Sequence, residues 1–374
     1  MAAAQIESDG PDGTTALRPF TYQASENFVG VLNEIRASLL VSTYQAGRLV
    51  SVGVSRGTLN VTLHTYERAM GVAVAPDRIA VGAGPQIWFL QTMPQIAHQL
   101  APPGKFDSCF VTRSSHVTGE IHSHDLAFSG PQIWLVNTLF SCVCTLHPNL
   151  SFMPQWKPPF ISAATAEDRC HLNGLAMADG RAQYATALGQ TDTPEGWRAG
   201  KAHGGCLIDI PQNAIVAWGF SMPHSPRIHQ GKVWLLDSGT GRLVTVDPQS
   251  GTSETVAELP GYTRGLTFAG AYAFIGLCKI RETATFGDVP IAALRDKLKC
   301  GVAVVELATG RFVSLLEFTA GIQEIFAVEI LPGTSCPAIS GPFVAKDDTQ
   351  PIYTMPENWI APGPEPARLP QSPR

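Results

Sequence analysis

A short strand-like segment, in which an apolar run follows a polar residue, recurs six times along the chain. The copies read RAMGVAV, HSHDLAF, HLNGLAM, PHSPRI, TRGLTF and QEIFAV. When they are aligned on their apolar residues, the equivalent positions are Met70, His124, Asn173, His224, Arg264 and Glu324. These positions lie 54, 49, 51, 40 and 60 residues apart. A period of roughly 20–50 residues or slightly more indicates one supersecondary unit repeated in a ring or an array.

The segments between these copies are typical of an all-β protein. Runs such as QIWFL, QIWLVNT, KVWLLDS and GVAVVEL are rich in β-branched and aromatic residues, and Gly, Pro, Asn or Asp bound them. The best helical candidate is the short stretch 290–299, which we expect in a loop. Units of four short strands repeated six times predict a six-bladed β-propeller whose first strands line a central channel. A seven-bladed ring is the alternative, with residues 38–64 as a further blade.

The two ends of the chain predict how this ring closes. The segment after Glu324 can supply an inner strand, and SLLVST, RLVSVGV and NVTLHT near the N-terminus can supply the outer strands of the same blade. Residues 1–25 are rich in Gly, Pro and polar residues, so we expect a disordered tail. We expect one propeller domain over residues 26–345, and a mostly irregular or disordered tail over 346–374.

Composition limits the kind of partner. The chain has 374 residues, 44% of them hydrophobic, and a formal net charge of −5 with scattered Lys and Arg. This distribution argues against nucleic acid and against a membrane surface. No signal peptide or long apolar span is evident, and the eight cysteines form no C-x-x-C pair, so we expect a cytoplasmic protein. A small-molecule or peptide-derived ligand remains, and the oligomeric state stays open.

Polar residues at the start of the inner strands are expected to ring one mouth of the channel. His124, His224 and Glu324 come from alternate blades, and two imidazoles with a carboxylate are a set that Zn²⁺, Fe²⁺ or Mn²⁺ accepts. His122 and His171 lie two residues before equivalent positions, where they can transfer protons. The alternative is a wet polar channel in which these side chains bind no metal.

Further residues near this mouth suggest substrate contacts. Asn173 and Arg264 can orient an anionic or carbonyl-bearing substrate, and Trp197 lies in the long loop 189–205 that can cover it. Arg227 can clamp a carboxylate or pair with a neighbouring blade. No G-x-S-x-G motif or Gly-rich phosphate loop is present.

Several motifs resemble those of a family of conserved hypothetical bacterial proteins without an assigned activity. They are RCHLNGLA, MPHSPR, ELPGYTRGL, SGTGRL, PPFISA and TALGQTDTPEGWR, and they span roughly residues 30–335. The resemblance implies a propeller-like fold with a shared site, but no substrate or catalytic residues. In architecture alone, the chain is similar to six-bladed metal enzymes such as lactonases and the peptidyl-hydroxyglycine lyase.

These observations lead to three functional hypotheses. The first is a divalent-metal-dependent hydrolase, lyase or isomerase that acts on a small or peptide-derived substrate at the loop-rich mouth. The second is a non-catalytic module that binds a peptide or a glycan there. The third is an iron-dependent oxygenase.

Overall fold

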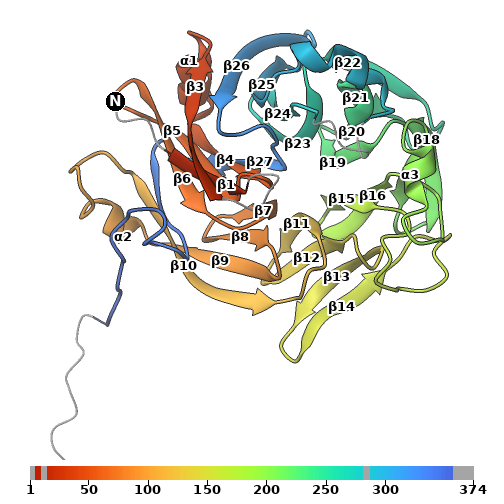
Figure 1. Ribbon diagram of the computed structural model, residues 1–374, viewed down its shortest axis with the longest axis horizontal. Helices are drawn as coiled ribbons and strands as arrows, with labels where there is room; N and C mark the ends of the chain where they lie inside the picture. Colours follow the sequence, from red (N-terminus) through yellow and green to blue (C-terminus); the bar gives the residue numbers. More distant parts are fainter. Residues whose placement is uncertain (1–4, 10–14, 281–286, 357–374) are drawn as a thin grey trace, which may run out of the picture.

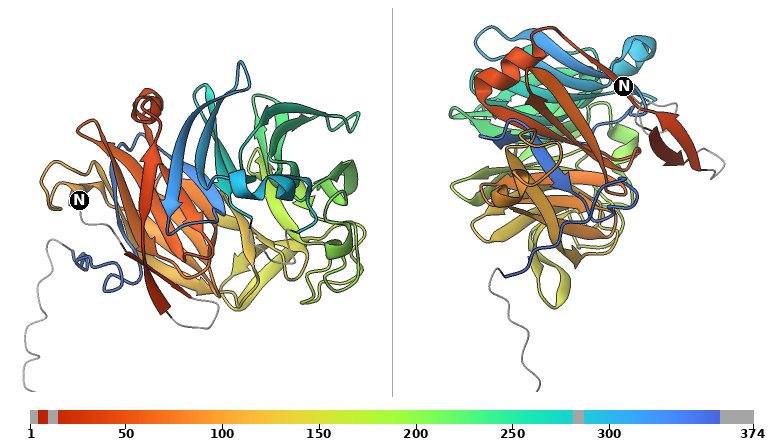
Figure 2. Two further views of the ribbon diagram at one scale, coloured as in Figure 1. Left: turned by 45° about the horizontal axis from the view of Figure 1, so that its top comes forward. Right: turned by 90° about the vertical axis from the view of Figure 1, so that its left-hand side faces the viewer.

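Six β-sheets radiate around a central axis in the computed structural model, which describes residues 5–9, 15–280 and 287–356 (Figure 1). Each sheet has four or five strands, and a separate two-stranded hairpin, β1 (Gln5–Asp9) and β2 (Thr15–Pro19), precedes them. Figure 2 shows this hairpin projecting from the body. The predicted six-bladed β-propeller is therefore confirmed, and the seven-bladed alternative is wrong.

The first three blades follow one another along the chain. Blade 1 contains β7 (Ala69–Ala75), β8 (Arg78–Ala83), β9 (Gln86–Thr92) and β10 (Ser108–Val117). Blade 2 contains β11 (Ser123–Ser129), β12 (Gln132–Asn137), β13 (Cys142–His147) and β14 (Leu150–Trp156). Blade 3 contains β15 (Leu172–Ala178), β16 (Arg181–Ala187), β17 (Gly205–Asp209) and β18 (Ala214–Phe220).

The next two blades repeat the same antiparallel order from the axis outward. Blade 4 contains β19 (Pro223–His229), β20 (Lys232–Asp237), β21 (Arg242–Val246) and β22 (Ser253–Glu258). Blade 5 contains β23 (Tyr262–Ala269), β24 (Tyr272–Cys278), β25 (Gly301–Glu306) and β26 (Arg311–Ala320). The inner strands thus all start at the same face of the ring.

Blade 6 closes the ring with strands from both ends of the chain. Its inner strand is β27 (Ala327–Pro332), followed outward by β4 (Ala37–Thr43), β5 (Arg48–Ser55) and β6 (Thr58–Thr65). β27 pairs antiparallel with β4, and the two strands lie side by side in Figure 1. The predicted closure is confirmed.

Two extra strands cover the outer edges of blades 5 and 1. β3 (Thr21–Ala24) pairs with β26, and β28 (Pro337–Ser340) pairs parallel with β10. Residues 21–24 were predicted as part of a disordered tail; instead they extend a sheet, because Phe20 beside them is buried against Phe318 with ring centroids 5.7 Å apart. An added edge strand also satisfies backbone groups that β26 would otherwise expose.

Helices are short and peripheral. They are α1 (Phe28–Ile35), α2 (Pro94–Ala97), α3 (Trp197–Gly200) and the 3₁₀ turns η1 (Ser238–Thr240) and η2 (Pro290–Lys297). The helical candidate at 290–299 is therefore a 3₁₀ segment. No helix within the described ranges has the length and apolar character needed to cross a membrane.

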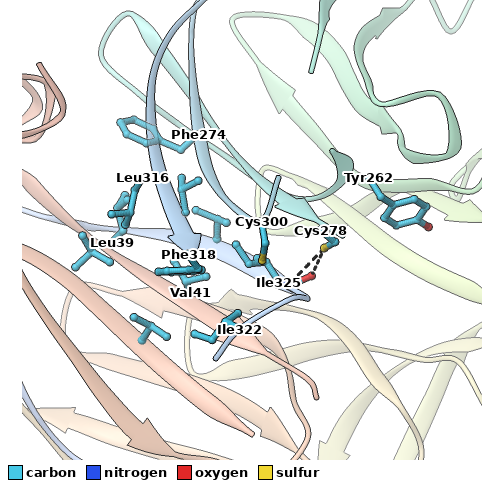
Figure 3. Close-up of a cluster of buried hydrophobic side chains, with 14 of the residues drawn as sticks. Leu39, Val41, Tyr262, Phe274, Cys278, Cys300, Leu316, Phe318, Ile322 and Ile325 are labelled. Atoms are coloured by element: carbon cyan, nitrogen blue, oxygen red, sulfur yellow. Dashed lines mark hydrogen bonds between the residues drawn. The ribbon is translucent and has the colours of Figure 1, made fainter. Parts of the chain in front are cut away.

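The closing seam between blades 5 and 6 is sealed by apolar side chains (Figure 3). Phe274 and Phe318 of blade 5 and Leu39 of blade 6 are fully buried there. The Cys278 thiol donates to the carbonyl of Ile325 at 3.1 Å and accepts from its N–H at 3.2 Å. These contacts fix the segment that leads into β27, and with it the sixth side of the channel.

Candidate functional site

A local irregularity near the start of an inner strand recurs in the first five blades. The pairing register shifts after Ala69 in blade 1, Ser123 in blade 2, Leu172 in blade 3, His224 in blade 4 and Thr263 in blade 5. Bulges of this kind re-aim side chains and are common at the rims of closed β structures. Met70, His124, Asn173 and Arg264 lie within this irregular segment and His224 directly precedes it, so the strand pairing agrees with the predicted equivalence of these five residues.

Blade 6 differs, because β27 pairs with β4 without a shift. Val328 lies opposite Val41 there, as Leu126 lies opposite Leu135 in blade 2. The hairpins beyond Val41 and Leu135 match, because each has two more residues before a four-residue connection. Val328 and Leu126 are therefore structurally equivalent.

Because β27 lacks the extra residue of the bulge, the strand pairing alone assigns no residue of blade 6 to the position of His124. Phe326 takes the sixth place in the ring, because its side chain contacts those of His124 and Arg264. Glu324, which the sequence alignment put there, lies two residues earlier and pairs with Arg264. We call the set Met70, His124, Asn173, His224, Arg264 and Phe326 the axial ring.

Aromatic and cationic side chains of the axial ring contact one another. The ring of His124 lies edge-on to that of His171, with centroids 4.8 Å apart, and edge-on to Phe326 at 4.9 Å. The guanidinium of Arg264 stacks on Phe326, 3.5 Å from the ring centroid. Blades 2, 3, 5 and 6 thus converge on one small volume at the mouth.

The imidazole of His124 is held in one tautomer. Its Nδ1 lies 3.2 Å from the carbonyl oxygen of His122 and 2.7 Å from the hydroxyl of Thr138. The single hydroxyl proton of Thr138 goes to the carbonyl of Leu172 at 2.5 Å. Thr138 must therefore accept from His124, so Nδ1 carries the proton and Nε2 is an unprotonated acceptor.

His224 repeats this arrangement in blade 4. Its Nδ1 lies 2.8 Å from the carbonyl oxygen of Met222 and 3.0 Å from the hydroxyl of Ser238. Met222 and His122 both adopt left-handed backbone angles, with φ of 50° and 54°. Each contributes the carbonyl two residues before the histidine. Neither His124 nor His224 uses Nε2 in a hydrogen bond with the described part of the chain.

Burial keeps both imidazoles neutral. His124 and His224 are only 7% and 3% exposed, and burial lowers the pKa of each well below its usual range. The neighbouring Arg264 guanidinium and the His171 ring add to this lowering of both pKa values. Burial also lowers the pKa of His122. His122, His124 and His224 are therefore neutral imidazoles rather than imidazolium cations.

His171 is held from the side by the loop before its strand. Its Nδ1 lies 2.7 Å from a carboxylate oxygen of Asp168, which also accepts from the Trp197 indole N–H at 3.2 Å. The indole packs on His171 with centroids 4.4 Å apart and is only 1% exposed. Trp197 was predicted to contact substrate; in the structure it is covered and positions Asp168 and His171.

Asn173 and Arg264 also make defined contacts. Asn173 donates to the carbonyl of Pro223 at 3.0 Å and accepts from Thr186 at 2.7 Å, which ties blade 3 to blade 4. Arg264 pairs with Glu324 at 3.3 Å and is 7% exposed. The amide of Asn173 thus links two blades, whereas Nε of Arg264 has no hydrogen-bond partner among the described residues.

The described residues contain no group of three or more His, Cys, Asp or Glu side chains placed to hold a metal ion. Glu324, one of the three predicted ligands, instead faces Arg264. The set His124, His224 and Glu324 therefore stays a prediction. The individual histidines do suit a metal, because metal-bound imidazoles are neutral and their other nitrogen donates to a carbonyl or carboxylate.

A charge cluster joins alternate blades at positions one to three residues beyond the axial ring along the inner strands. Arg227 donates to both carboxylate oxygens of Asp125, at 2.8 and 3.2 Å, and lies 3.5 Å from Glu329. These three residues, the axial triad, come from β19, β11 and β27. Arg227 was predicted to clamp a ligand or pair with a neighbouring blade; it pairs across the axis with blades 2 and 6.

Burial acts on the axial triad as well. It raises the pKa of Glu329 to about 7. The guanidinium of Arg227 lowers this pKa, but by less than burial raises it. The two carboxylates in turn hold the pKa of Arg227 above its usual value, despite burial. Arg227 is therefore a permanent cation shared by two acids.

The fold and the site define a class: a six-bladed β-propeller with a polar mouth of buried histidines and an ion-paired axis. The chain belongs to the family of the domain of unknown function DUF4915, whose model matches residues 26–340. The predicted kinship with an uncharacterised propeller family is thereby confirmed.

Comparison with solved structures supports the fold alone. A propeller chain in the crystal structure of a nidogen/laminin complex is similar, with a TM-score of 0.50 and 11% sequence identity over 79% of this chain and 99% of that one. No curated protein matches the chain. Because one fold serves many functions, activity must be argued from the mouth itself.

Proposed function

We propose that the mouth of the channel binds a small organic acid that carries hydroxyl or amino groups, of the hydroxy-acid, amino-acid or peptide-terminus type. The observation that carries this proposal is the shared tautomer of His124 and His224. The Nε2 lone pairs of the two rings can accept hydrogen bonds from a ligand and cannot donate any. A ligand that suits them brings its own N–H or O–H donors.

Arg264 and Phe326 favour a ligand that also carries a carboxylate group. Arg264 is planar and buried, and it is braced by Phe326 on one side and by Glu324 at one nitrogen only. A guanidinium in this position suits a carboxylate, which it can bind through two parallel hydrogen bonds. The aromatic ring of Phe326 can pack on the carbon skeleton beside that carboxylate.

Ligand binding can be tested with a panel of small hydroxy and amino acids, ranked by thermal shift and then by isothermal titration calorimetry. Arg264→Gln should lower affinity for the best binder at least tenfold, because a charged hydrogen bond contributes about 1.5–3 kcal/mol. Arg242→Gln removes an exposed arginine outside the mouth and is the matched control. Equal affinity in both variants would refute the proposal.

A metal-dependent enzyme is the second candidate, and a specific observation favours it. Three imidazoles at the mouth, those of His124, His171 and His224, each direct Nδ1 to a carbonyl or a carboxylate. Outer contacts of this kind orient the histidines of zinc and iron sites. A bound divalent ion would polarise a carbonyl or activate water. His122 lies beside them for proton transfer.

Metal analysis separates the two candidates. If the protein is a metal-dependent enzyme, purified protein incubated with Zn²⁺, Mn²⁺ or anaerobic Fe²⁺ should retain one equivalent of the metal ion after gel filtration. His224→Gln should then lose it, whereas His98→Gln, at an exposed site, should not. Retention of Fe²⁺ alone would favour the oxygenase. Loss of all three ions from the unmodified chain would refute the metal-dependent enzyme.

A further inference from the structure

A cavity lies at the end of the inner strands opposite the mouth. It has a volume of about 650 Å³ and lies where β7, β23 and β27 end, between blades 5, 6 and 1. Its lining mixes apolar residues, with Val74, Phe268 and Leu331 among them, and polar residues such as Thr267 and Ser108. A volume of roughly 300–1,000 Å³ that combines apolar surface with a few polar groups is typical of small-molecule sites. We call it the distal cavity.

The distal cavity has one charged residue among those that line it. This is Glu329, the third member of the axial triad, whose side chain is 18% exposed. Asp125 already occupies both ends of the Arg227 guanidinium, whereas Glu329 reaches it only at 3.5 Å. The triad therefore contains two carboxylates for one cation, and the unbalanced carboxylate faces the cavity.

We propose that the distal cavity binds a compact apolar molecule with one ammonium group, which pairs with Glu329. A primary or secondary amine supplies the missing positive charge and up to three N–H donors, for Glu329 and a nearby hydroxyl. The apolar remainder of such a molecule covers the Val74, Phe268 and Leu331 wall. This site does not depend on the histidine mouth, from which the axial triad separates it.

The ionisation behaviour of Glu329 agrees with this assignment. Burial raises the pKa of its carboxyl to about 7, because Arg227 does not fully compensate for lost solvation and the charge of Asp125 opposes ionisation. Asp125 and Arg227 are the ionisable groups beside it, since the other residues lining the cavity are apolar or carry hydroxyls. The ammonium group of a ligand can therefore replace the proton that Glu329 otherwise binds.

The test compares two probes of nearly the same shape, phenethylamine and 2-phenylethanol, by isothermal titration calorimetry or by NMR titration. At pH 8 the amine should bind at least tenfold more tightly than the alcohol. Glu329→Gln keeps the size of the side chain and should reduce this preference to less than twofold. Glu258→Gln removes an exposed carboxylate and should leave the preference intact.

A second variant guards against a folding defect in Glu329→Gln. Ala75→Leu adds volume at the rim of the distal cavity without touching the axial triad, and should weaken binding of both probes at least tenfold. Equal affinity for amine and alcohol, or unchanged binding in Ala75→Leu, would overturn the assignment. Because His224→Gln lies at the other mouth, it should leave phenethylamine binding unchanged whatever becomes of the organic-acid proposal.

Discussion

The two ends of the propeller axis hold ionisable groups that burial shifts in opposite directions. At the mouth, His124 and His224 are bases whose pKa values lie well below their usual range. Toward the distal cavity, Glu329 is an acid whose pKa rises to about 7. Both shifts have the same physical cause, since a poorly solvated site disfavours whichever form is charged. The difference teaches that one fold can present lone pairs at one end and an anion-forming group at the other.

The same difference sets the sign of each contribution to stability. A base with a lowered native pKa makes the folded state lose stability as pH falls below about 6.5, because only the unfolded chain then gains the proton. An acid with a raised native pKa does the reverse, and stability falls as pH rises from about 4.5 to 7.

The largest expected effect comes from breaking the axial triad. Arg227→Leu leaves Asp125 and Glu329 as buried acids without their cation. Removing one partner of a buried pair costs about 3–5 kcal/mol, so the free energy of unfolding should fall by that amount. Urea denaturation followed by tryptophan fluorescence measures it at pH 7.5.

Arg242→Leu is the control for that measurement. Arg242 also pairs with a glutamate, Glu258, but both side chains are largely exposed. Exposed pairs contribute only about 0–1 kcal/mol. If the two variants cost the same, the axial triad does not hold the blades together.

The second effect concerns the pH dependence at the distal end. Glu329→Gln removes an acid whose pKa shifts from 4.5 to about 7 on folding. The stability of the variant relative to the unmodified chain should therefore rise by about 3 kcal/mol between pH 4 and pH 8. Chemical denaturation at four pH values tests this. Parallel pH profiles for the two proteins would mean that the carboxyl of Glu329 titrates normally.

The third effect concerns the histidines of the mouth, whose contribution to stability changes with pH in the opposite direction. His124→Gln or His224→Gln removes a base that stays neutral in the folded state. Below pH 6.5 the unmodified chain should lose up to about 1.4 kcal/mol per pH unit for each such histidine, so each variant should show a flatter profile between pH 7 and 5. His98→Gln is the surface control. A variant profile as steep as that of the unmodified chain would contradict the buried neutral state.

Much of this comparison could be predicted from the sequence, but only on the side of the mouth. Met70, His124, Asn173, His224 and Arg264 could be aligned because each lies at the same irregularity in a repeated strand pattern. Phe326 could not, because β27 lacks the irregularity, and the alignment on apolar residues placed Glu324 there instead.

The axial triad and the distal cavity could not be predicted from a single sequence. Arg227 is 102 residues from Asp125 and 102 from Glu329, and nothing local indicates that three charges meet on the axis. The distal cavity is formed by the ends of apolar strands from three blades, whose pattern there is that of any buried strand. Long-range closure of the ring brings these residues together, so only the coordinates show it.

The smallest expected effect tests the tautomer of His124, on which the proposed ligand binding at the mouth depends. Thr138→Val deletes the hydroxyl that accepts from His124 and donates to the carbonyl of Leu172. The loss should cost about 1 kcal/mol, since His124 keeps its bond to His122. Ser238→Ala is the matched change beside His224. In ¹⁵N NMR of the unmodified chain, Nε2 of both rings should have the shift of an unprotonated nitrogen. A protonated Nε2 would mean that the mouth donates hydrogen bonds, so the ligand would have to be an acceptor at all its polar positions.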